Sequence, residues 1–446
     1  MVHVADESLE AKIQRVGNPV RMLRNSPQGA YALPLGSEFS NWRDEQAAWM
    51  STAILFDQSR HMTDVYFKGR DVKRFFTGLG VNSFAKFGKD KAKQFVAVNP
   101  DGHVIGDAIL FGRDEEEYSL VGRPAAPDWA AFQAETSGYD ITVTRDERGV
   151  ARRLFRYQIQ GPNACKIVEK ARGGALPEIR FFNIGHFDIA GVRVRALNHT
   201  MSRHPGLEIN GPSEHAAAVL DALLGAGAEF GLKQGGALSY VTTATESGWI
   251  PSPTPAIYSG AATRPYREFL SGSGWEGTAS IGGSFVSDDI EDYYQTPWDL
   301  GYGRHIKFDH DFIGREALER LAEGPHRRKV WLRWRDEDVT RVLASSLFGG
   351  GERAKYLAAP SSVYATLPFD TVLAGDRQIG LSTYSAYTVN VGAWSSLAMI
   401  EEAEAVDGRE VVVVWGEPDG GTDKPVVERH TQTEIRATVS TRPLAS

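Results

Sequence analysis

Residues 296–318 read TPWDLGYGRHIKFDHDFIGREAL, and this segment is the best guide to the fold. Glycine and aromatic residues fill its first half, and its end has the spacing of an amphipathic helix. The composition changes after it, because strand-like runs such as residues 329–334 (KVWLRW) and 410–415 (EVVVVW) then dominate. We therefore predict that the segment joins an α+β region, residues 1–325, to an all-β domain, residues 326–446.

The bulk composition indicates a multidomain cytoplasmic protein. A chain of 446 residues with 42% hydrophobic content can fill two or three cores. Its formal charge of −8, without a block of Lys and Arg, argues against nucleic-acid and membrane-surface partners. Cys165 is the single cysteine, so no internal disulfide can form, which fits a reducing compartment. The start of the chain lacks the apolar core of a signal peptide. For the oligomeric state, we expect a monomer or a homodimer.

A β-meander is predicted before the joining segment. Residues 94–98 and 104–112 have the character of strands, and Asp101-Gly102 is a turn signal between them. A third strand, residues 118–123 (YSLVGR), follows an acidic turn.

Two later stretches look like insertions. Residues 247–284 lie within a run rich in Gly, Ser, Thr and Pro, and residues 340–360 have a tip of three glycines at 349–351.

Two motifs in the chain lack the context that would make them functional. A GxGxxG pattern at residues 272–277 does not open a helical pattern, so we interpret it as a loop rather than a dinucleotide site. Two histidine pairs, at residues 199 and 204 and at residues 305 and 310, are each five residues apart. Zinc-binding helical pairs favour shorter spacings, so no metal is expected.

Five segments together resemble the glycine cleavage T-protein (aminomethyltransferase) family. They are residues 296–318, 159–162 (IQGP), 206–209 (GLEI), the hairpin of residues 101–110 and residues 380–400. The resemblance implies a clover-leaf fold of ferredoxin-like α+β subdomains around a central folate hole, with a C-terminal antiparallel β-barrel. Tetrahydrofolate is then the implied cofactor, acting as methyl acceptor.

Departures from the family pattern indicate a subgroup. Gly106 stands where amine-handling members have the first of two Asp residues, and Arg123 stands where they have Asn. These changes, with the segments DQSRH, LVGR and ESGWIPSP, are similar to tetrahydrofolate-dependent aryl methyl ether O-demethylases, such as those acting on vanillate, syringate or dicamba. The resemblance implies methyl transfer from a methoxylated aromatic acid to N5 of tetrahydrofolate.

The implied chemistry assigns catalytic roles to three residues. An aryloxide leaving group has a basicity close to that of tyrosinate, so it needs a donor as it forms. Tyr240 is the first choice for that donor and His61 the second, and Asp107 is expected to assist near N5.

The implied ligand contacts are divided between substrate and folate. Arg123, helped by Arg60 or Tyr31, is expected to bind the substrate carboxylate. The residues expected to contact tetrahydrofolate are Glu208, Trp249, Gln160, Val121 and Tyr240. Gln160 has an equally ordinary interpretation as the cap of a strand end.

Two alternatives stay open at this stage. One is an aminomethyltransferase, or a demethylase of small amines or sulfonium compounds, in the same family. The other is a folate-binding protein without catalytic activity.

Overall fold

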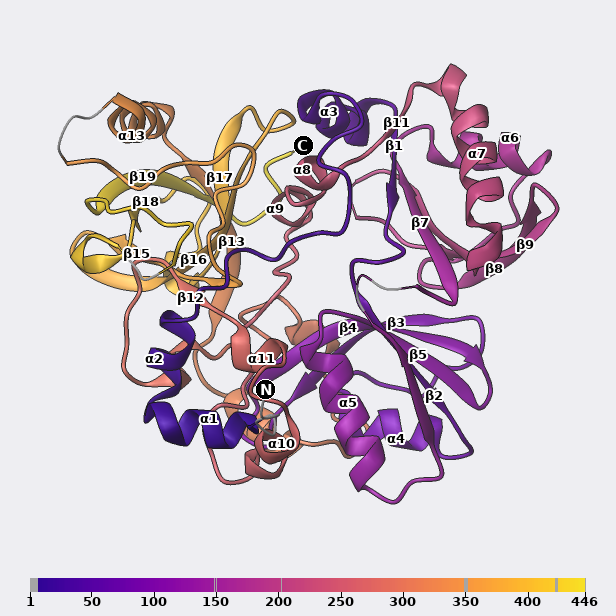
Figure 1. Cartoon of the computed structure of the whole chain (residues 1–446), viewed down its shortest axis with the longest axis horizontal. Helices are drawn as coiled ribbons and strands as arrows, with labels where there is room; N and C mark the ends of the chain where they lie inside the picture. The colour runs from indigo at the N-terminus through magenta and orange to yellow at the C-terminus, as the bar shows by residue number, and fades with distance from the viewer. Residues whose placement is uncertain are drawn as a thin grey trace, which may run out of the picture.

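The computed structural model describes residues 7–147, 149, 151–201, 203–348, 352–421 and 424–445. Two sheets with their helices and one barrel form three lobes, as Figure 1 shows. The expected α+β class and the C-terminal antiparallel barrel are confirmed. Within the described ranges, no helix is both long enough and apolar enough to cross a membrane.

The first sheet is antiparallel, with the strand order β3-β4-β5-β2-β6. The β3–β4 hairpin forms at the predicted turn, where Gly102 has a φ of +84° that glycine adopts without strain. Helices α4 and α5 pack on the sheet, and their apolar side chains join its core. The bounds are β2 (Thr63–Lys68), α4 (Val72–Leu79), β3 (Ala92–Val98), β4 (Val104–Asp114), β5 (Glu117–Gly122), α5 (Ala125–Thr136) and β6 (Thr142–Asp146).

The second sheet has the order β11-β1-β7-β10-β9-β8. In the sequence, β1 precedes the strands of the first sheet and the other strands of the second sheet follow them. Among the described strand pairs of this sheet, β1 and β11 run parallel and the other pairs are antiparallel. Helices α6 and α7 pack against each other and share a core with this sheet. The bounds are β1 (Ala53–Asp57), β7 (Leu154–Gln160), α6 (Ala164–Arg172), β8 (Ile184–Ile189), β9 (Val192–Asn198), β10 (Gly206–Pro212), α7 (Ala216–Gly227) and β11 (Leu232–Gln234).

The third lobe is a closed barrel with the order β13-β17-β16-β15-β18-β19. Part of its wall packs against the remainder of the chain, because Trp331, Leu397 and Met399 belong to the same buried cluster as the first sheet. The domain boundary at residue 325 therefore stays a prediction. The bounds are β13 (Arg327–Trp334), β15 (Asp370–Ala374), β16 (Arg377–Thr388), β17 (Ala393–Glu401), β18 (Glu410–Trp415) and β19 (Thr433–Ser440).

The two expected insertions contain regular structure. Residues 340–348 form most of helix α13 (Asp336–Phe348), while the glycines at 349–351 lie outside the described residues. Residues 247–284 include α10 (Arg264–Phe269), α11 (Trp275–Thr278) and β12 (Ile281–Gly282), which pairs with β14 (Leu367–Pro368). Helix α10 contacts α1 (Leu9–Val16), and β12 contacts α2 (Pro19–Arg24), so the insertion and the N-terminal helices lie together (Figure 1).

The joining segment, residues 296–318, contacts both the lobe of the first sheet and the residue that precedes the first barrel strand, β13. Trp298 stacks on His326, with ring centroids 4.1 Å apart, directly before β13. The Lys307 N–H donates to the Val81 carbonyl at 2.9 Å, and the Ile313 N–H donates to the Gly78 carbonyl at 3.0 Å. The segment ends in helix α12 (Arg315–Leu321), where a helix was predicted, and this helix continues three residues beyond Leu318.

Gly314 is the point at which this segment depends most on glycine. Its φ is +84°, and a Cβ there would lie 2.4 Å from the Asn99 carbonyl oxygen. Gly314→Ala is expected to lower the free energy of unfolding by roughly 2–3 kcal/mol, through strain and that clash. Gly225 lies inside α7 with open space around it, so Gly225→Ala should be neutral or slightly stabilising. Urea unfolding of both variants checks this, and equal midpoints would contradict it.

Candidate active site

A cavity of about 550 Å³ lies where the two sheets and β13 meet. Its lining comes from β3, β4 and β5 of the first sheet and from β7 and β10 of the second. The short helices α8 (Ala237–Tyr240) and α9 (Thr243–Ser247), the joining segment and the barrel strand β13 complete it. A cavity of this volume is large enough to hold a drug-sized ligand.

Tyr240 and His61 form a hydrogen-bonded pair in the cavity wall. The Tyr240 Oη and the His61 Nε2 are 2.9 Å apart, and the His61 Nδ1 lies 3.0 Å from the Gln58 carbonyl oxygen. Because a carbonyl only accepts, the His61 Nδ1 must carry the hydrogen, and Nε2 accepts from Tyr240. The Gln58 side-chain amide donates to the Tyr240 Oη at 3.3 Å. Gln58 therefore orients both partners.

Burial keeps this pair neutral. Burial, with the positive charges of Arg123 and Arg156 in addition, lowers the pKa of His61 to about 3. Burial raises the pKa of Tyr240, and the positive charge of Arg123 opposes that rise. At neutral pH the site therefore presents a phenol next to an imidazole base, without an imidazolium ion.

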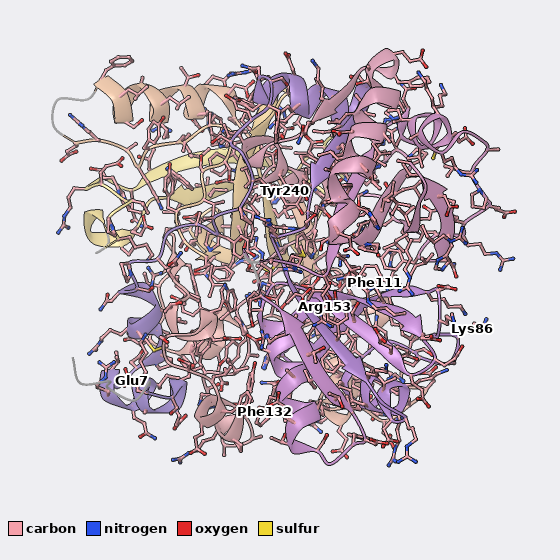
Figure 2. All side chains as sticks on the ribbon, turned by 45° about the vertical axis from the view of Figure 1, so that its right-hand side comes forward. Glu7, Lys86, Phe111, Phe132, Arg153 and Tyr240 are labelled. Atoms are coloured by element: carbon pink, nitrogen blue, oxygen red, sulfur yellow. The ribbon has the colours of Figure 1, made fainter. Side chains whose placement is uncertain are left out.

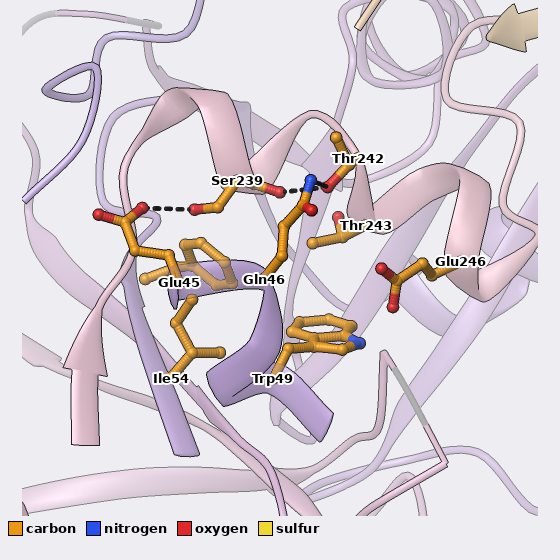
Figure 3. A pocket seen from close by; sticks show the side chains of 9 residues that line it. Glu45, Gln46, Trp49, Ile54, Ser239, Thr242, Thr243 and Glu246 are labelled. Atoms are coloured by element: carbon orange, nitrogen blue, oxygen red, sulfur yellow. Dashed lines mark hydrogen bonds between the residues drawn. The ribbon is translucent and has the colours of Figure 1, made fainter. Parts of the chain in front are cut away.

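Hydrogen bonds from helix α3 (Trp42–Ser51) hold the chain segment that contains Tyr240. Figure 3 shows the bonds to the side chains of Ser239 and Thr242, on either side of Tyr240 in the sequence. Glu45 accepts from the Ser239 Oγ at 2.8 Å and from the Gly236 N–H at 2.9 Å. Gln46 donates to the Thr242 Oγ1 at 3.0 Å. The space among these side chains is about 10 Å³, at most one water molecule. This small cavity cannot hold a ligand, and the hydrogen bonds around it have a structural role.

Arg123 provides a positive charge beside this pair. Its guanidinium lies 3.5 Å from the centroid of the Tyr31 ring, and the Tyr31 hydroxyl donates to the His61 carbonyl. Its buried Nη1 has no hydrogen-bond partner within the described part of the chain. Since a buried charged donor is costly without a partner, this atom is suited to an anionic ligand group. Arg123 and Tyr31 are not among the residues that line the cavity, although both lie next to His61. Arg60, also expected to bind substrate, is exposed and does not line the cavity either.

Asp107 is held by three donors from separate parts of the chain. Its Oδ2 accepts from the Gln94 amide at 2.6 Å, the Trp249 Nε1 at 2.9 Å and the Tyr302 hydroxyl at 2.8 Å. Burial raises the pKa of Asp107, while the bonds from Trp249 and Tyr302 and the charge of Lys329 oppose the rise. Burial also lowers the pKa of Lys329 to about 8. Trp249 is thereby fixed as one wall of the cavity.

Glu208 belongs to a buried ion network. The guanidinium of Arg156 contacts Glu208 through Nη1 and Asp64 through Nη2, the latter at 3.1 Å. Arg156 also lies over the Phe111 ring, 5.1 Å from its centroid, and Phe111 is labelled in Figure 2 together with Tyr240. Glu208 and Phe111 both line the cavity.

Gln160 supports the cavity from outside. Its Oε1 accepts from the Met201 N–H at 3.1 Å, and its Nε2 donates to the Pro205 carbonyl at 3.0 Å. These bonds fix the turn that places His199 and Met201 in the cavity wall. The His199 Nδ1 is buried without a hydrogen-bond partner among the described residues. Gln160 does not itself line the cavity, whereas Val121 does.

Several cavity residues were absent from the sequence prediction. Gln58 lies in the DQSRH segment, which was part of the family resemblance. Its contacts with both His61 and Tyr240, however, depend on the fold. Arg156 and Lys329 lie within strand patterns that carry no motif. The joining segment, used only as evidence for the fold, contributes three lining residues, namely Tyr302, Arg304 and His305.

Comparison with known proteins assigns the family. Residues 17–252 match the family model described as the GCVT N-terminal domain. The structure of glycine cleavage system aminomethyltransferase T from Bartonella henselae superposes with a TM-score of 0.61, covering 94% of each chain at 18% identity, which shows the shared fold. The chain belongs to the aminomethyltransferase (GCVT) family.

Two curated relatives refine this comparison. A syringate O-demethylase from Sphingobium sp. is 45% identical to this chain, covering 99% of it and 96% of that protein. A sesamin methylene transferase from Sinomonas sp. is 29% identical and covers 92% of this chain and 88% of that protein.

The protonation state of His61 can be measured directly. With the pKa of His61 lowered to about 3, the imidazole should stay in the neutral Nδ1–H form between pH 8 and pH 5, whereas an unperturbed histidine titrates near pH 6.5. Nitrogen NMR of histidine-labelled protein checks this, with the signal assigned by its loss in His61→Gln. A His61 signal that titrates between pH 6 and 7, or an Nε2–H tautomer, would contradict the geometry.

Proposed function

We propose that the protein is a tetrahydrofolate-dependent O-demethylase that converts an aryl methyl ether to a phenol, with formation of 5-methyltetrahydrofolate. The observation that carries this proposal is the neutral Tyr240–His61 pair in the cavity wall, together with the charge of Arg123, which acts on both groups and whose Nη1 has no hydrogen-bond partner among the described residues. The 45% identity to a syringate O-demethylase along nearly the whole chain supports it.

The cavity residues fit tetrahydrofolate. The Glu208 carboxylate can accept from the N–H groups of a pterin, and the buried His199 Nδ1 is available to a polar ligand atom. Trp249 and Phe182 provide flat walls for aromatic rings. When bound, tetrahydrofolate supplies the N5 nucleophile that takes the methyl group, and the proton lost from N5 balances the one that the phenol gains.

Tyr240 holds the proton that the leaving oxygen requires. Its raised pKa keeps it a phenol, and a phenol matches the basicity of a departing aryloxide. To donate to that oxygen, the hydroxyl turns away from His61 Nε2, while the Gln58 amide continues to donate to the Tyr240 oxygen. The positive charge of Arg123 favours negative charge on the same oxygen. The remaining contribution of the site is alignment of carbon, nucleophile and leaving group.

Arg123 indicates a substrate with a carboxylate. A guanidinium binds a carboxylate through two parallel hydrogen bonds, and stacking on Tyr31 limits the directions in which Arg123 can point. In this proposal, a methoxybenzoate bound by Arg123 directs its ring toward the Tyr240–His61 pair. Methoxylated benzoates such as syringate or vanillate are therefore the proposed substrate class.

The proposal is tested with purified protein and a panel of methoxybenzoates. Phenol formation is followed by chromatography, with and without tetrahydrofolate. At least one acid in the panel should yield its phenol only when tetrahydrofolate is present. Absence of phenol from every acid, with tetrahydrofolate bound, would reject the proposed activity.

Replacement of the Tyr240 hydroxyl should lower the rate of methyl transfer more than the affinity for tetrahydrofolate. Tyr240→Phe is expected to lower kcat by about 10²- to 10⁴-fold and to change the Kd for tetrahydrofolate little, because the donor acts on the leaving oxygen. Tyr258→Phe is the matched control, since this buried hydroxyl bonds to the Glu276 carbonyl outside the cavity. Single-turnover kinetics and equilibrium binding separate the two effects. Comparable losses of kcat in both variants would remove Tyr240 from the proton-donor role.

Removal of the Arg123 charge should act on the substrate carboxylate. Arg123→Gln is expected to raise the KM for a methoxybenzoate by roughly 10- to 100-fold, as for loss of a charged hydrogen bond. The KM for the same methoxyarene without its carboxylate should change little. Arg60→Gln serves as control, because Arg60 is exposed outside the cavity. A larger effect from Arg60 than from Arg123 would reassign the carboxylate site.

A further inference from the structure

Glu246 is a buried carboxyl group that the proposed reaction does not use. It lies in α9, directly before residues 247–249, which line the large cavity. Its own side chain lines the small cavity of about 10 Å³ instead. A carboxyl group in this place can act on the wall of the large cavity only by holding the chain segment that forms it.

The turn between β16 and β17 of the barrel supplies hydrogen bonds to Glu246. The Asn390 side-chain amide donates to the Glu246 Oε1 at 3.0 Å and to its Oε2 at 3.1 Å. The same amide donates to the Gln46 carbonyl of α3 at 2.9 Å, and the Val389 N–H donates to the Gln46 Oε1 at 3.0 Å. Three separate parts of the chain, namely α9, α3 and the barrel turn, therefore meet at Asn390.

The same junction is connected to Tyr240 and Trp249. The Thr243 hydroxyl donates to the Tyr240 carbonyl at 2.7 Å, where the chain passes from α8 to α9. The Trp331 Nε1 donates to the Thr245 carbonyl at 2.7 Å, so the barrel strand β13 also holds α9. A shift of α9 would therefore displace the tyrosine on one side of it and the tryptophan on the other.

A buried donor faces Glu246 in the small cavity. Trp49 and Glu246 both line this cavity, and Figure 3 shows the indole nitrogen of Trp49 on the side of the Glu246 carboxyl group. The Trp49 Nε1 has no hydrogen-bond partner among the residues that the structure describes. One water molecule is enough to bridge such a donor to a carboxyl oxygen. The Trp49 ring also contacts Phe56, which contacts Tyr240, with centroids 6.0 Å and 5.1 Å apart.

The titratable groups that surround Glu246 do not include a cation. The barrel turn places Asn390 and Thr388 against it, and both are neutral. Helix α3 places Glu45 in the same small cavity, and this carboxylate already accepts hydrogen bonds from the segment that contains α8. In α8 the titratable group is Tyr240, a neutral phenol that lines the large cavity. Within the described part of the chain, no positive charge therefore acts on Glu246.

Burial without a cation favours the neutral carboxyl group. Burial raises the pKa of Glu246 to about 7, although the bonds from Asn390 and Thr388 oppose the rise. In an opened segment that water reaches, the group would ionise near the ordinary glutamate pKa of about 4.3. The closed segment therefore binds the proton more tightly than the opened one, and a rise in pH between these two values favours opening.

We propose that Glu246 is a positioning residue whose neutral carboxyl group holds α8 and α9 against α3 and the barrel turn. Loss of its proton weakens this hold, so the placement of Tyr240 and Trp249 loosens as the pH rises toward neutrality. The barrel turn does not line the large cavity, yet it acts on the cavity wall through Asn390. The effect on turnover rests on the proposed demethylation, whereas the hold on the segment does not.

Hydrogen exchange followed by mass spectrometry tests the hold without any ligand. Peptides that cover residues 237–249 are compared between pH 5 and pH 8, with exchange times scaled to the intrinsic exchange rate at each pH. In wild-type protein, the opening equilibrium of this segment should rise about tenfold or more and level off above pH 7, because one pKa unit of coupling corresponds to a factor of ten.

Three variants assign the effect to Glu246. Glu246→Gln keeps the shape of the neutral group and cannot ionise, so its opening equilibrium should not change with pH. Asn390→Ala removes a donor that opposes the raised pKa, so the levelling should move to higher pH. Glu135→Gln, at an exposed site in the last turn of α5, should behave as wild type. Opening that is independent of pH in wild-type protein, or a wild-type pH dependence in Glu246→Gln, would overturn the proposal.

Turnover separates this inference from the proposed activity. The ratio of kcat in wild-type protein to kcat in Glu246→Gln should fall severalfold from pH 5 to pH 8, because alignment of the donor is lost only where the group ionises. A pH-dependent hold without phenol formation from any methoxybenzoate would support the role of Glu246 while rejecting the demethylation. Phenol formation with opening that is independent of pH would reject the role of Glu246 and retain the demethylation.

Discussion

One buried guanidinium joins the two sheets at the cavity. Arg156 extends from β7 of the second sheet and contacts Glu208 on β10 and Asp64 on β2 of the first sheet. Removal of this charge would leave the buried Glu208 carboxylate without its ion-pair partner, and Asp64 would keep only the Tyr66 hydroxyl at 3.0 Å and Arg113 at 4.0 Å. Such a loss is far more costly than loss of an exposed pair. The position of Glu208 at the cavity, and the relative position of the two sheets that line it, therefore depend on this network.

Burial also determines the protonation of the reacting groups. The same low-polarity surroundings that lower the pKa of His61 raise the pKa of Tyr240, so the pair remains neutral and the proton remains on the phenol. Gln58 fixes this state, because its backbone carbonyl selects the histidine tautomer and its side chain bonds to the tyrosine oxygen. Arg123 adds a positive charge that forms no ion pair with any residue the structure describes. These properties support the proposed binding of an anionic aromatic ligand and the proposed proton transfer to its leaving oxygen.

The sequence predicts the fold class and much of the cavity lining, and it does so mainly through family resemblance. Six of the predicted site residues line one cavity, namely Tyr240, His61, Asp107, Glu208, Trp249 and Val121. The other four, Arg123, Tyr31, Arg60 and Gln160, are not among its lining residues, and the roles of all ten stay predictions. The sequence could not identify Arg156 and Lys329 as cavity residues. The pattern of a strand does not show which strand of another sheet it faces in the folded protein. The segment of residues 296–318 indicated the fold correctly, but its Tyr302 and Arg304 reach the cavity only through a path fixed by contacts with Val81 and Gly78.

The central claim is that the methyl–oxygen bond of an aryl ether is broken in this cavity and that the methyl group moves intact to folate. A methoxybenzoate with a CD3 group and an ¹⁸O ether oxygen tests this in one mass-spectrometric measurement. The account predicts that all three deuterium atoms appear in 5-methyltetrahydrofolate and that the phenol retains ¹⁸O. Release of the label as formaldehyde, or a phenol oxygen derived from water, would contradict it.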